Sequence, residues 1–330
     1  MRAVSSLVVV LMMVGLSYAG GRIAVLRPVF GVVVPYAAIA VFLIGFSWRV
    51  IRWALTPVPF RIPATCGQQR SLGWIKRAKL DNPATVLGVT GRMALEILLF
   101  RSLFRNTRAE LHQGPRLAYG EEKWLWLGAL AFHWSFLIIF LRHLRFFMEP
   151  VPAFVGSIQA VDGFFQIGTP VLYLTGAAIL PALLYLLWRR LASPQLRYIS
   201  LFTDYFALFL LLGIVISGLV MRYFTRTDVV AVKQYAIGLV TLAPTVPAAV
   251  TALFFMHLGM VSALLAYFPF SKLMHMPGVF LSPTRNLANT SRMKRHVNPW
   301  DYPVKVHTYQ EWEEEFRDKI IAAGLPLDKE

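Results

Sequence analysis

The chain of 330 residues is 57% hydrophobic and only 15% charged, with a mean hydropathy of +0.56. A soluble protein this apolar could not cover its surface with polar groups, so the composition predicts a polytopic membrane protein. The formal net charge of +16 would suggest nucleic-acid binding in a soluble protein. Here the Lys and Arg residues gather in particular loops, as membrane insertion requires, and we expect no nucleic-acid role.

Two apolar segments open the chain. The first, residues 4–18, is short, and residues 17–20 could be read as a signal-peptidase site. Because only one basic residue precedes it, we favour a retained anchor, and either alternative leaves Gly21 outside the cytoplasm. The second segment, residues 29–48, is long enough to span a membrane. Residues 1–28 are therefore expected to form an N-terminal anchor and an outer loop.

Residues 49–123 form a long polar loop with thirteen Lys or Arg against five acids. This excess of positive charge places the loop in the cytoplasm. Within it, residues 84–104 have the composition of a helix, but three charged residues interrupt the apolar pattern. We expect an interfacial amphipathic helix there, and a seventh span is the alternative. Its apolar side would carry Met93, Ile97, Phe100 and Phe104.

Four further apolar segments follow, at residues 124–147, 166–188, 201–221 and 247–275. The loop 148–165 has no Lys or Arg and belongs outside, whereas Arg189 and Arg190 mark a cytoplasmic turn. The sixth segment should be one helix through His275, with a kink at Pro269. The sequence therefore predicts an all-α bundle of about six transmembrane helices within residues 29–275 and the anchor, with both termini cytoplasmic.

The last part of the chain, residues 276–330, is polar and is expected to be a cytoplasmic tail. Thr308 and Glu311 have the spacing of a capping box and predict a helix that ends near Gly324. Trp312, Phe316 and Ile320 fall every fourth residue on this helix. Such a stripe suits a docked partner subunit, although packing against the chain's own membrane domain is an alternative.

Four of the seven histidines lie in the third and sixth apolar segments, and no other candidate span holds one. They are His133, His143, His257 and His275. At a rise of about 1.5 Å per residue, the first pair is about 15 Å apart and the second about 27 Å, so neither pair can share one metal ion within its own helix. Two antiparallel helices would instead bring His133 to His275 and His143 to His257. Two imidazoles at each of two depths is what an iron porphyrin ligated on both faces requires.

Two alternatives stay open for these histidines. They could be buried residues bonded to neighbouring carbonyls or hydroxyls, although intramembrane ionisable groups are costly and usually functional. The chain could also be a cofactor-free transporter or scaffold, but such folds usually show internal repeats and none is visible here. The single cysteine, Cys66, excludes covalent haem attachment and an iron-sulfur cluster built by this chain alone, so any haem would be of the b type.

The short sequence motifs around the histidines resemble those of a known family. Phe132-His133 is followed by Arg142-His143, and Met256-His257-Leu258-Gly259-Met260 is followed by Phe-Pro-Phe-Ser-Lys-Leu-Met-His at residues 268–275. These motifs, together with histidines ten and eighteen residues apart, resemble those of the cytochrome b (gamma) subunit of respiratory nitrate reductase. The resemblance covers roughly residues 28–275. The first apolar segment, residues 282–287 and residues 294–300 look more like one branch, DsrM of the DsrMKJOP sulfite-reduction electron-transfer complex.

The resemblance implies a di-haem cytochrome b subunit of a respiratory complex in a bacterial or archaeal cytoplasmic membrane. Such a subunit passes electrons between menaquinol, or another quinol, and a cytoplasmic iron-sulfur partner similar to DsrK. Other membrane and periplasmic subunits and a place in dissimilatory sulfur metabolism are implied as well. Within the family, a nitrate reductase gamma-type or heterodisulfide-reductase-type cytochrome b is the alternative.

The expected sites follow from depth in the bilayer. His133 and His275 would hold the inner haem iron, and His143 and His257 the outer one. Arg142 and Arg145 would flank the outer haem and pair with its propionates, or simply reach toward the outer interface. The resemblance also implies a quinol site beside the outer haem, for which the polar groups available are Glu149, Gln159 and Asp162. The nitrate reductase relatives use a lysine there, and loop 148–165 has none.

Overall fold

The computed structural model describes residues 1–56, 67–105, 108–112, 114, 116–166, 170–282, 284–293, 303 and 306–328. Cys66 and residues 294–300, which entered the sequence analysis, lie outside the described residues. Within the described part, six helices are long and apolar enough to cross a membrane. They are α1 (Arg2–Arg22), α2 (Val34–Ala54, preceded by irregular helical turns from Ala24), α5 (Lys123–Phe147), α7 (Leu174–Ala192), α9 (Phe202–Tyr223) and α11 (Ala252–Tyr267). This confirms the predicted all-α bundle and its six spans.

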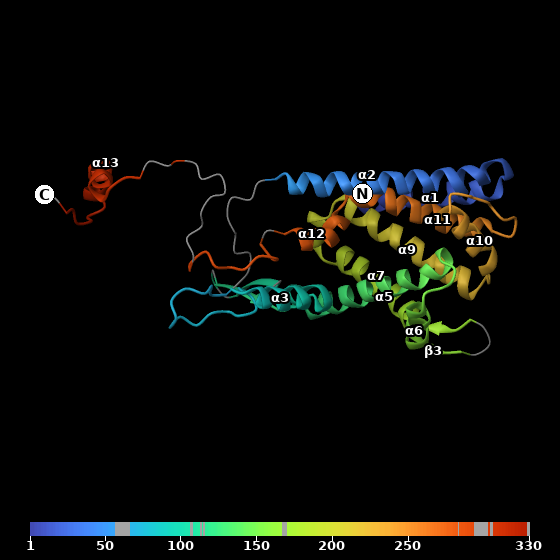
Figure 1. Ribbon diagram of the computed structural model, residues 1–330, viewed down its shortest axis with the longest axis horizontal. Helices are drawn as coiled ribbons and strands as arrows, with labels where there is room; N and C mark the ends of the chain where they lie inside the picture. The colour runs from blue at the N-terminus through green and yellow to red at the C-terminus, as the bar shows by residue number, and fades with distance from the viewer. Residues whose placement is uncertain are drawn as a thin grey trace.

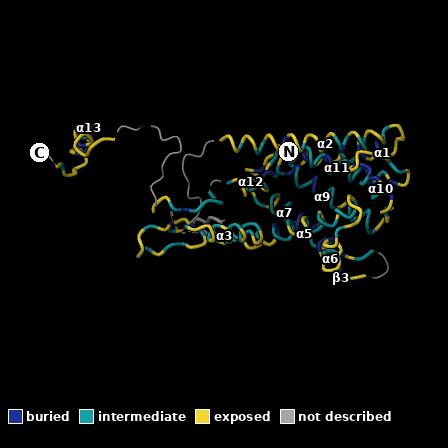
Figure 2. Tube along the Cα trace, in the orientation of Figure 1, coloured by how far each residue is buried: buried dark blue, intermediate teal, exposed yellow. Residues whose placement is uncertain are grey.

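The spans pack side by side as one bundle (Figure 1). Helix α11 lies between α1, α2 and α9, while α7 joins α9 to α5. The outward sides of α1 and α2 are exposed and apolar, as at Leu43 and Ile44 (Figure 2). Lipid tails are as apolar as leucine, so such exposed faces suit a bilayer. The first helix packs against α9 and α11 and is part of the bundle.

Close approach of α1 to α11 depends on Gly259. A Cβ atom at Gly259 would overlap the side chain of Ser17 on α1. Small residues at such contacts let membrane helices approach closely, which matters because lipid provides no hydrophobic driving force between helices. Farther along, Gly45 of α2 packs against Pro269, where a Cβ would meet the proline Cβ at 2.9 Å.

The sixth span is broken rather than one helix through His275, so the expectation of five continuous turns between His257 and His275 is wrong. Helix α11 ends at Tyr267, and two 3-10 turns, Phe268–Phe270 and Lys272–Met274, lead into α12 (His275–Leu281). Pro269 lacks an amide hydrogen, and Ser271 is extended, at φ −117° and ψ 177°. The Ser271 hydroxyl donates to the Phe268 carbonyl and accepts from the Leu273 amide, which satisfies backbone groups freed by the break.

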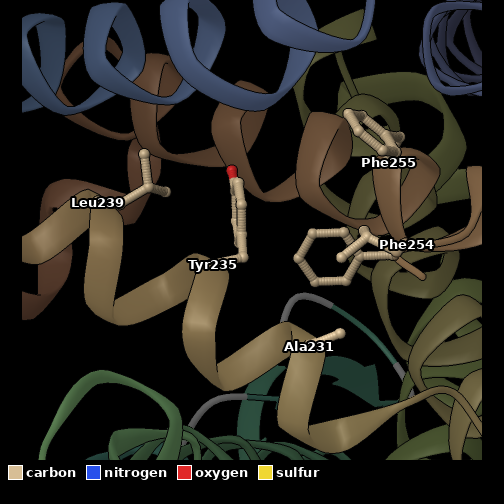
Figure 3. Packing of buried hydrophobic residues seen from close by; sticks show 6 residues of the cluster. Ala231, Tyr235, Leu239, Phe254 and Phe255 are labelled. Atoms are coloured by element: carbon tan, nitrogen blue, oxygen red, sulfur yellow. The ribbon is translucent and has the colours of Figure 1, made fainter. Parts of the chain in front are cut away.

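The connection between α9 and α11 folds into a further short helix, α10 (Val229–Val240), which was not expected. The Asp228 carboxylate caps its first turn by accepting from two backbone amides. On its inner side Tyr235 stacks edge-on against Phe254 of α11 at 5.3 Å and donates to the Gly31 carbonyl at 2.6 Å. Figure 3 shows this cluster, which closes one end of the bundle. Its buried members are Ala231, Tyr235, Leu239, Val250, Phe254 and Phe255.

The outer loop after α5 is also folded. It contains α6 (Ala153–Asp162) and a short antiparallel pair, β3 (Gly163–Phe165) with β4 (Leu172–Tyr173). The fourth span therefore begins at Leu174 and not at residue 166 as expected. A short helix, α8 (Pro194–Ile199), connects α7 to α9, with the Ser193 hydroxyl as its N-cap.

The expected helix in the basic loop is present as α3 (Val86–Leu99) and α4 (Arg101–Phe104). Phe100 separates them in the left-handed conformation, at φ 50°. Two tryptophans of α5 hold the end of α3: Trp126 donates to the Leu99 carbonyl and Trp134 to the Leu98 carbonyl. A hairpin of β1 (Arg108–His112) and β2 (Arg116–Gly120) then leads into α5.

The predicted tail helix is α13 (Tyr309–Ala322), and its capping box between Thr308 and Glu311 is confirmed. It lies well away from the helix bundle in Figure 1. Of its expected stripe, Trp312 is exposed and Phe316 is half-buried, but Ile320 is buried. The following residues fold back, since the Leu325 amide donates to the Ile320 carbonyl. The exposed stripe is therefore shorter than predicted.

Replacing Gly259 by Val should push α1 away from α11, because the new side chain meets Ser17. Overpacking of this kind costs about 1–3 kcal/mol. We expect a lower temperature of half-aggregation in detergent, measured by size-exclusion chromatography after heating. Gly15→Val is the matched control, because a Cβ at Gly15 meets nothing within 4 Å. Equal loss of stability in both variants would mean that helix propensity, and not the α1–α11 contact, sets the effect.

Candidate functional site

The structure brings His133 of α5 next to His275 at the start of α12. Their ring centres are 6.0 Å apart, and the rings are nearly perpendicular, at 85°. The Nδ1 atom of His133 lies 2.7 Å from the Ala129 carbonyl oxygen, and that of His275 lies 2.8 Å from the Lys272 carbonyl oxygen. Each Nδ1–H therefore donates to backbone, which leaves Nε2 of each ring as the free nitrogen.

The distance between the two ring centres can be compared with the distance expected for two imidazoles that bind one metal ion. An imidazole nitrogen lies about 1 Å from its ring centre and bonds a metal at about 2 Å, so two imidazoles on one metal place their centres about 6 Å apart. The distance between His133 and His275 fits this geometry. The rings of Phe100 and Phe132 contact His133 edge-on, at 5.0 and 4.9 Å, and make the surroundings apolar.

The number of ligands distinguishes a bare ion from a porphyrin. No three His, Cys, Asp or Glu residues gather as a metal site anywhere in the described ranges. A structural zinc ion takes four protein ligands, so two histidines alone would hold it poorly. A porphyrin brings four nitrogens of its own and needs only two axial imidazoles. The residues present therefore fit haem better than an isolated metal ion.

The other two histidines lie on α5, near its C-terminal end, and on α11, near its N-terminal end. The Nδ1 atom of His143 is 2.7 Å from the Ile139 carbonyl oxygen. His257 takes its partner from another helix, since its Nδ1 lies 2.9 Å from the Ser217 hydroxyl of α9. A Cβ at Gly218 would lie 3.5 Å from the His257 ring, so α9 also shapes this site.

Next to His143 in the sequence, Arg142 contacts the side chains of Asp162 and Tyr173. Its Nη1 lies 2.9 Å from the Asp162 carboxylate, both side chains being mostly buried, and its guanidinium stacks on Tyr173 at 3.6 Å. Arg222 approaches the same ring at 4.4 Å. The ion pair lacks hydrogen-bond geometry, and the Nε and Nη1 atoms of Arg142 make no hydrogen bond within the described residues. Arg142 therefore keeps donors available to a further acceptor.

The three polar candidates of the outer loop have different surroundings. Asp162 is buried, and its two oxygens accept from the amide and the hydroxyl of Thr175, at 2.9 and 2.6 Å. It therefore holds α6 to the start of α7 and presents little to a ligand. Gln159 is half-buried on α6. Glu149 forms an ion pair with Lys233 of α10.

This ion pair lies in an open surface cavity of about 600 Å³ between the C-terminal end of α5 and helix α10. Arg145, which stacks on Phe146 at 5.6 Å, lines the same cavity. The remaining wall is mostly apolar: Val229, Val230, Ile237, Gly238 and Ala243, with Gln234 and Thr245. Sequence reasoning missed Lys233 because it searched only loop 148–165. The available signal was that Lys233 is the one lysine in residues 222–246.

Known proteins resemble the chain over most of its length. The nitrate reductase gamma subunit family matches residues 89–295, so the match begins after α2 and extends beyond His275, rather than covering 28–275 as expected. The chain is 48% identical over 281 residues to the Hdr-like menaquinol oxidoreductase cytochrome b-like subunit of Archaeoglobus fulgidus, which covers 83% of each chain. It is 42% identical over 274 residues, 81% of each chain, to the protein of the same description from Archaeoglobus profundus. The chain is a multi-pass membrane protein that belongs to the nitrate reductase gamma subunit family.

Proposed function

We propose that this chain is the di-haem cytochrome b subunit of a menaquinol-oxidising complex in a bacterial or archaeal cytoplasmic membrane. One observation carries the proposal: the four histidines each use Nδ1 in a hydrogen bond, and the rings of His133 and His275 lie with their centres 6.0 Å apart. The relatives described as cytochrome b-like subunits of a menaquinol oxidoreductase support the same assignment.

His133 and His275 are the ligands proposed for the inner haem iron, and His143 and His257 those for the outer one. Haem, when bound, supplies a one-electron carrier at each depth. The chain contributes the imidazoles, fixes their tautomers through the Nδ1 hydrogen bonds, and excludes water with apolar side chains. Arg142 and Arg145 remain the groups proposed for the outer propionates, supported by the free Nε and Nη1 donors of buried Arg142.

We place quinol oxidation in the cavity at the outer end of α5. Loss of two electrons from a quinol releases two protons, so the site needs a proton acceptor near the outer surface. Glu149 can accept a proton on its carboxylate, and Lys233 can hold that carboxylate in place and donate to a quinone oxygen. Gln159 lies on the neighbouring helix α6, whereas Asp162 is already bonded to Thr175 and Arg142.

The direction of transfer follows from the expected topology. With both termini cytoplasmic, electrons enter at the His143 and His257 end and leave at the His133 and His275 end, toward a cytoplasmic iron-sulfur partner similar to DsrK. The basic loop 49–123 and the exposed Trp312 of α13 are the surfaces proposed for that partner. A DsrM-like place in dissimilatory sulfur metabolism, with other membrane and periplasmic subunits, belongs to the same proposal.

Removal of either inner ligand should abolish the same haem. His133→Ala and His275→Ala should each lower the haem content from two to one per chain and leave the outer haem intact, because one axial nitrogen must come from each helix. Pyridine haemochrome stoichiometry and electron paramagnetic resonance give the count and the identity of the lost signal. His307→Ala, an exposed tail histidine, is the control. Loss of different signals in the two inner variants would show that the pairing is wrong.

Quinol oxidation should depend on the ion pair in the outer cavity. Lys233→Met or Glu149→Gln should slow haem reduction by menaquinol by about a hundredfold, the size typical of a lost proton-transfer group. Dithionite should still reduce both haems fully, as followed by the absorption spectrum. Lys123→Met breaks an exposed ion pair with Glu121 at the other end of α5 and serves as control. Normal rates in both outer variants would place the quinol elsewhere.

A further inference from the structure

Arg92 of α3 is a buried cation that the proposed function has not used. It is only 6% exposed, and its buried Nη1 atom makes no hydrogen bond in the part of the chain that the structure describes. Burial lowers the pKa of its guanidinium, and the nearby charge of Arg285 lowers it further. Arginine nevertheless stays protonated in proteins, so the burial of a donor without an acceptor is costly and calls for an explanation.

The neighbouring carboxylates are engaged with other donors. Glu96 pairs with Arg285 and accepts from the Ser102 hydroxyl at 2.6 Å. Asp81 pairs with Arg101 and Arg105. Neither carboxylate forms a hydrogen bond with Arg92 among the described residues, and this cluster holds more guanidinium groups than carboxylates. Arg92 is the buried member of this group, whereas Arg101, Arg105 and Arg285 are partly exposed. A buried guanidinium whose Nη1 has no protein acceptor suits an anionic ligand.

The position of Arg92 relates it to the inner histidine pair. Arg92 and Glu96 are spaced by four residues and so lie one turn apart on the same side of α3. Phe100, the residue that follows α3 in the left-handed conformation, contacts the ring of His133 at 5.0 Å. Arg285 follows His275 by ten residues and pairs with Glu96. The helix that carries Arg92 is therefore in contact with the segments of both inner histidines.

We propose that Arg92, assisted by Arg285, binds the propionate carboxylates of the inner haem. The proposal rests on the proposed function, because it requires a porphyrin between His133 and His275. Guanidinium groups pair with carboxylates through two parallel hydrogen bonds, so one arginine on α3 and one after α12 can serve the two propionates. An anionic phospholipid at the cytoplasmic surface offers the same chemistry through its phosphate and must be distinguished by experiment.

The test is a redox titration of both haems in the purified full-length chain. Arg92→Gln should keep two haems but lower the midpoint potential of the inner haem, because a nearby positive charge stabilises the reduced iron. The outer haem should titrate as in the unmodified protein, and Arg92→Lys should restore part of the shift. Arg70→Gln, which removes an exposed arginine of the same loop, is the matched control and should change neither potential. Selective loss of the inner haem in Arg92→Gln, with retention in Arg92→Lys, would also support the assignment.

Three outcomes would overturn it. An inner potential that is the same in Arg92→Gln and Arg70→Gln means that no propionate lies at Arg92. A fall in co-purified phospholipid phosphorus with unchanged potentials assigns Arg92 to a lipid. Loss of both haems from Arg92→Gln and Arg92→Lys alike assigns it to folding. Absence of two haems from the unmodified protein would instead contradict the proposed function, so the two failures can be told apart.

Discussion

A hydrogen bond at Nδ1 holds each of the four membrane histidines, and the proposed cofactor sites depend on it. An imidazole N–H without an acceptor is costly in an apolar bilayer, so the bond stabilises the fold as well as the ring. His133 and His143 both use the carbonyl four residues earlier in α5, at 2.7 Å. The same helical geometry therefore orients two rings ten residues apart. Each keeps Nε2 free toward the neighbouring helices.

His257 and His275 do not bond to the carbonyl four residues earlier. Each is held by a different element. His257 is held by Ser217 of α9, whose hydroxyl also donates to the Gly213 carbonyl at 2.7 Å. His275 comes after the break in the sixth span, and its Nδ1 bonds to a carbonyl within the 3-10 turn before α12. The break thus does more than end a helix. It turns the chain so that His275 lies against His133 rather than continuing along the axis of α11.

A set of polar contacts, here called the polar clamp, ties the basic loop to the segment after α12. The side-chain amide nitrogen of Asn289 donates to the side-chain oxygen of Asn82 at 2.7 Å, and the backbone N–H of Asn289 donates to the Pro83 carbonyl at 2.7 Å. Arg285 and Glu96 add an ion pair nearby. This clamp ties the segment before α3 to the segment after α12, so the elements that follow His275 are fixed to the loop that precedes α5.

Composition and spacing alone determined the class of protein, the six spans and the four histidines, because hydropathy and helical period are local properties of a sequence. The same local rules predicted the α13 capping box. The tertiary structure alone decided the break at Pro269 and Ser271, the pairing of Arg142 with Asp162, and the meeting of Glu149 with Lys233, residues 84 positions apart. It also left Arg92 buried, with no acceptor for Nη1 among the residues that the structure describes. Each of these depends on which side chains from distant segments come together, and that is set by helix packing rather than by any pattern within one segment.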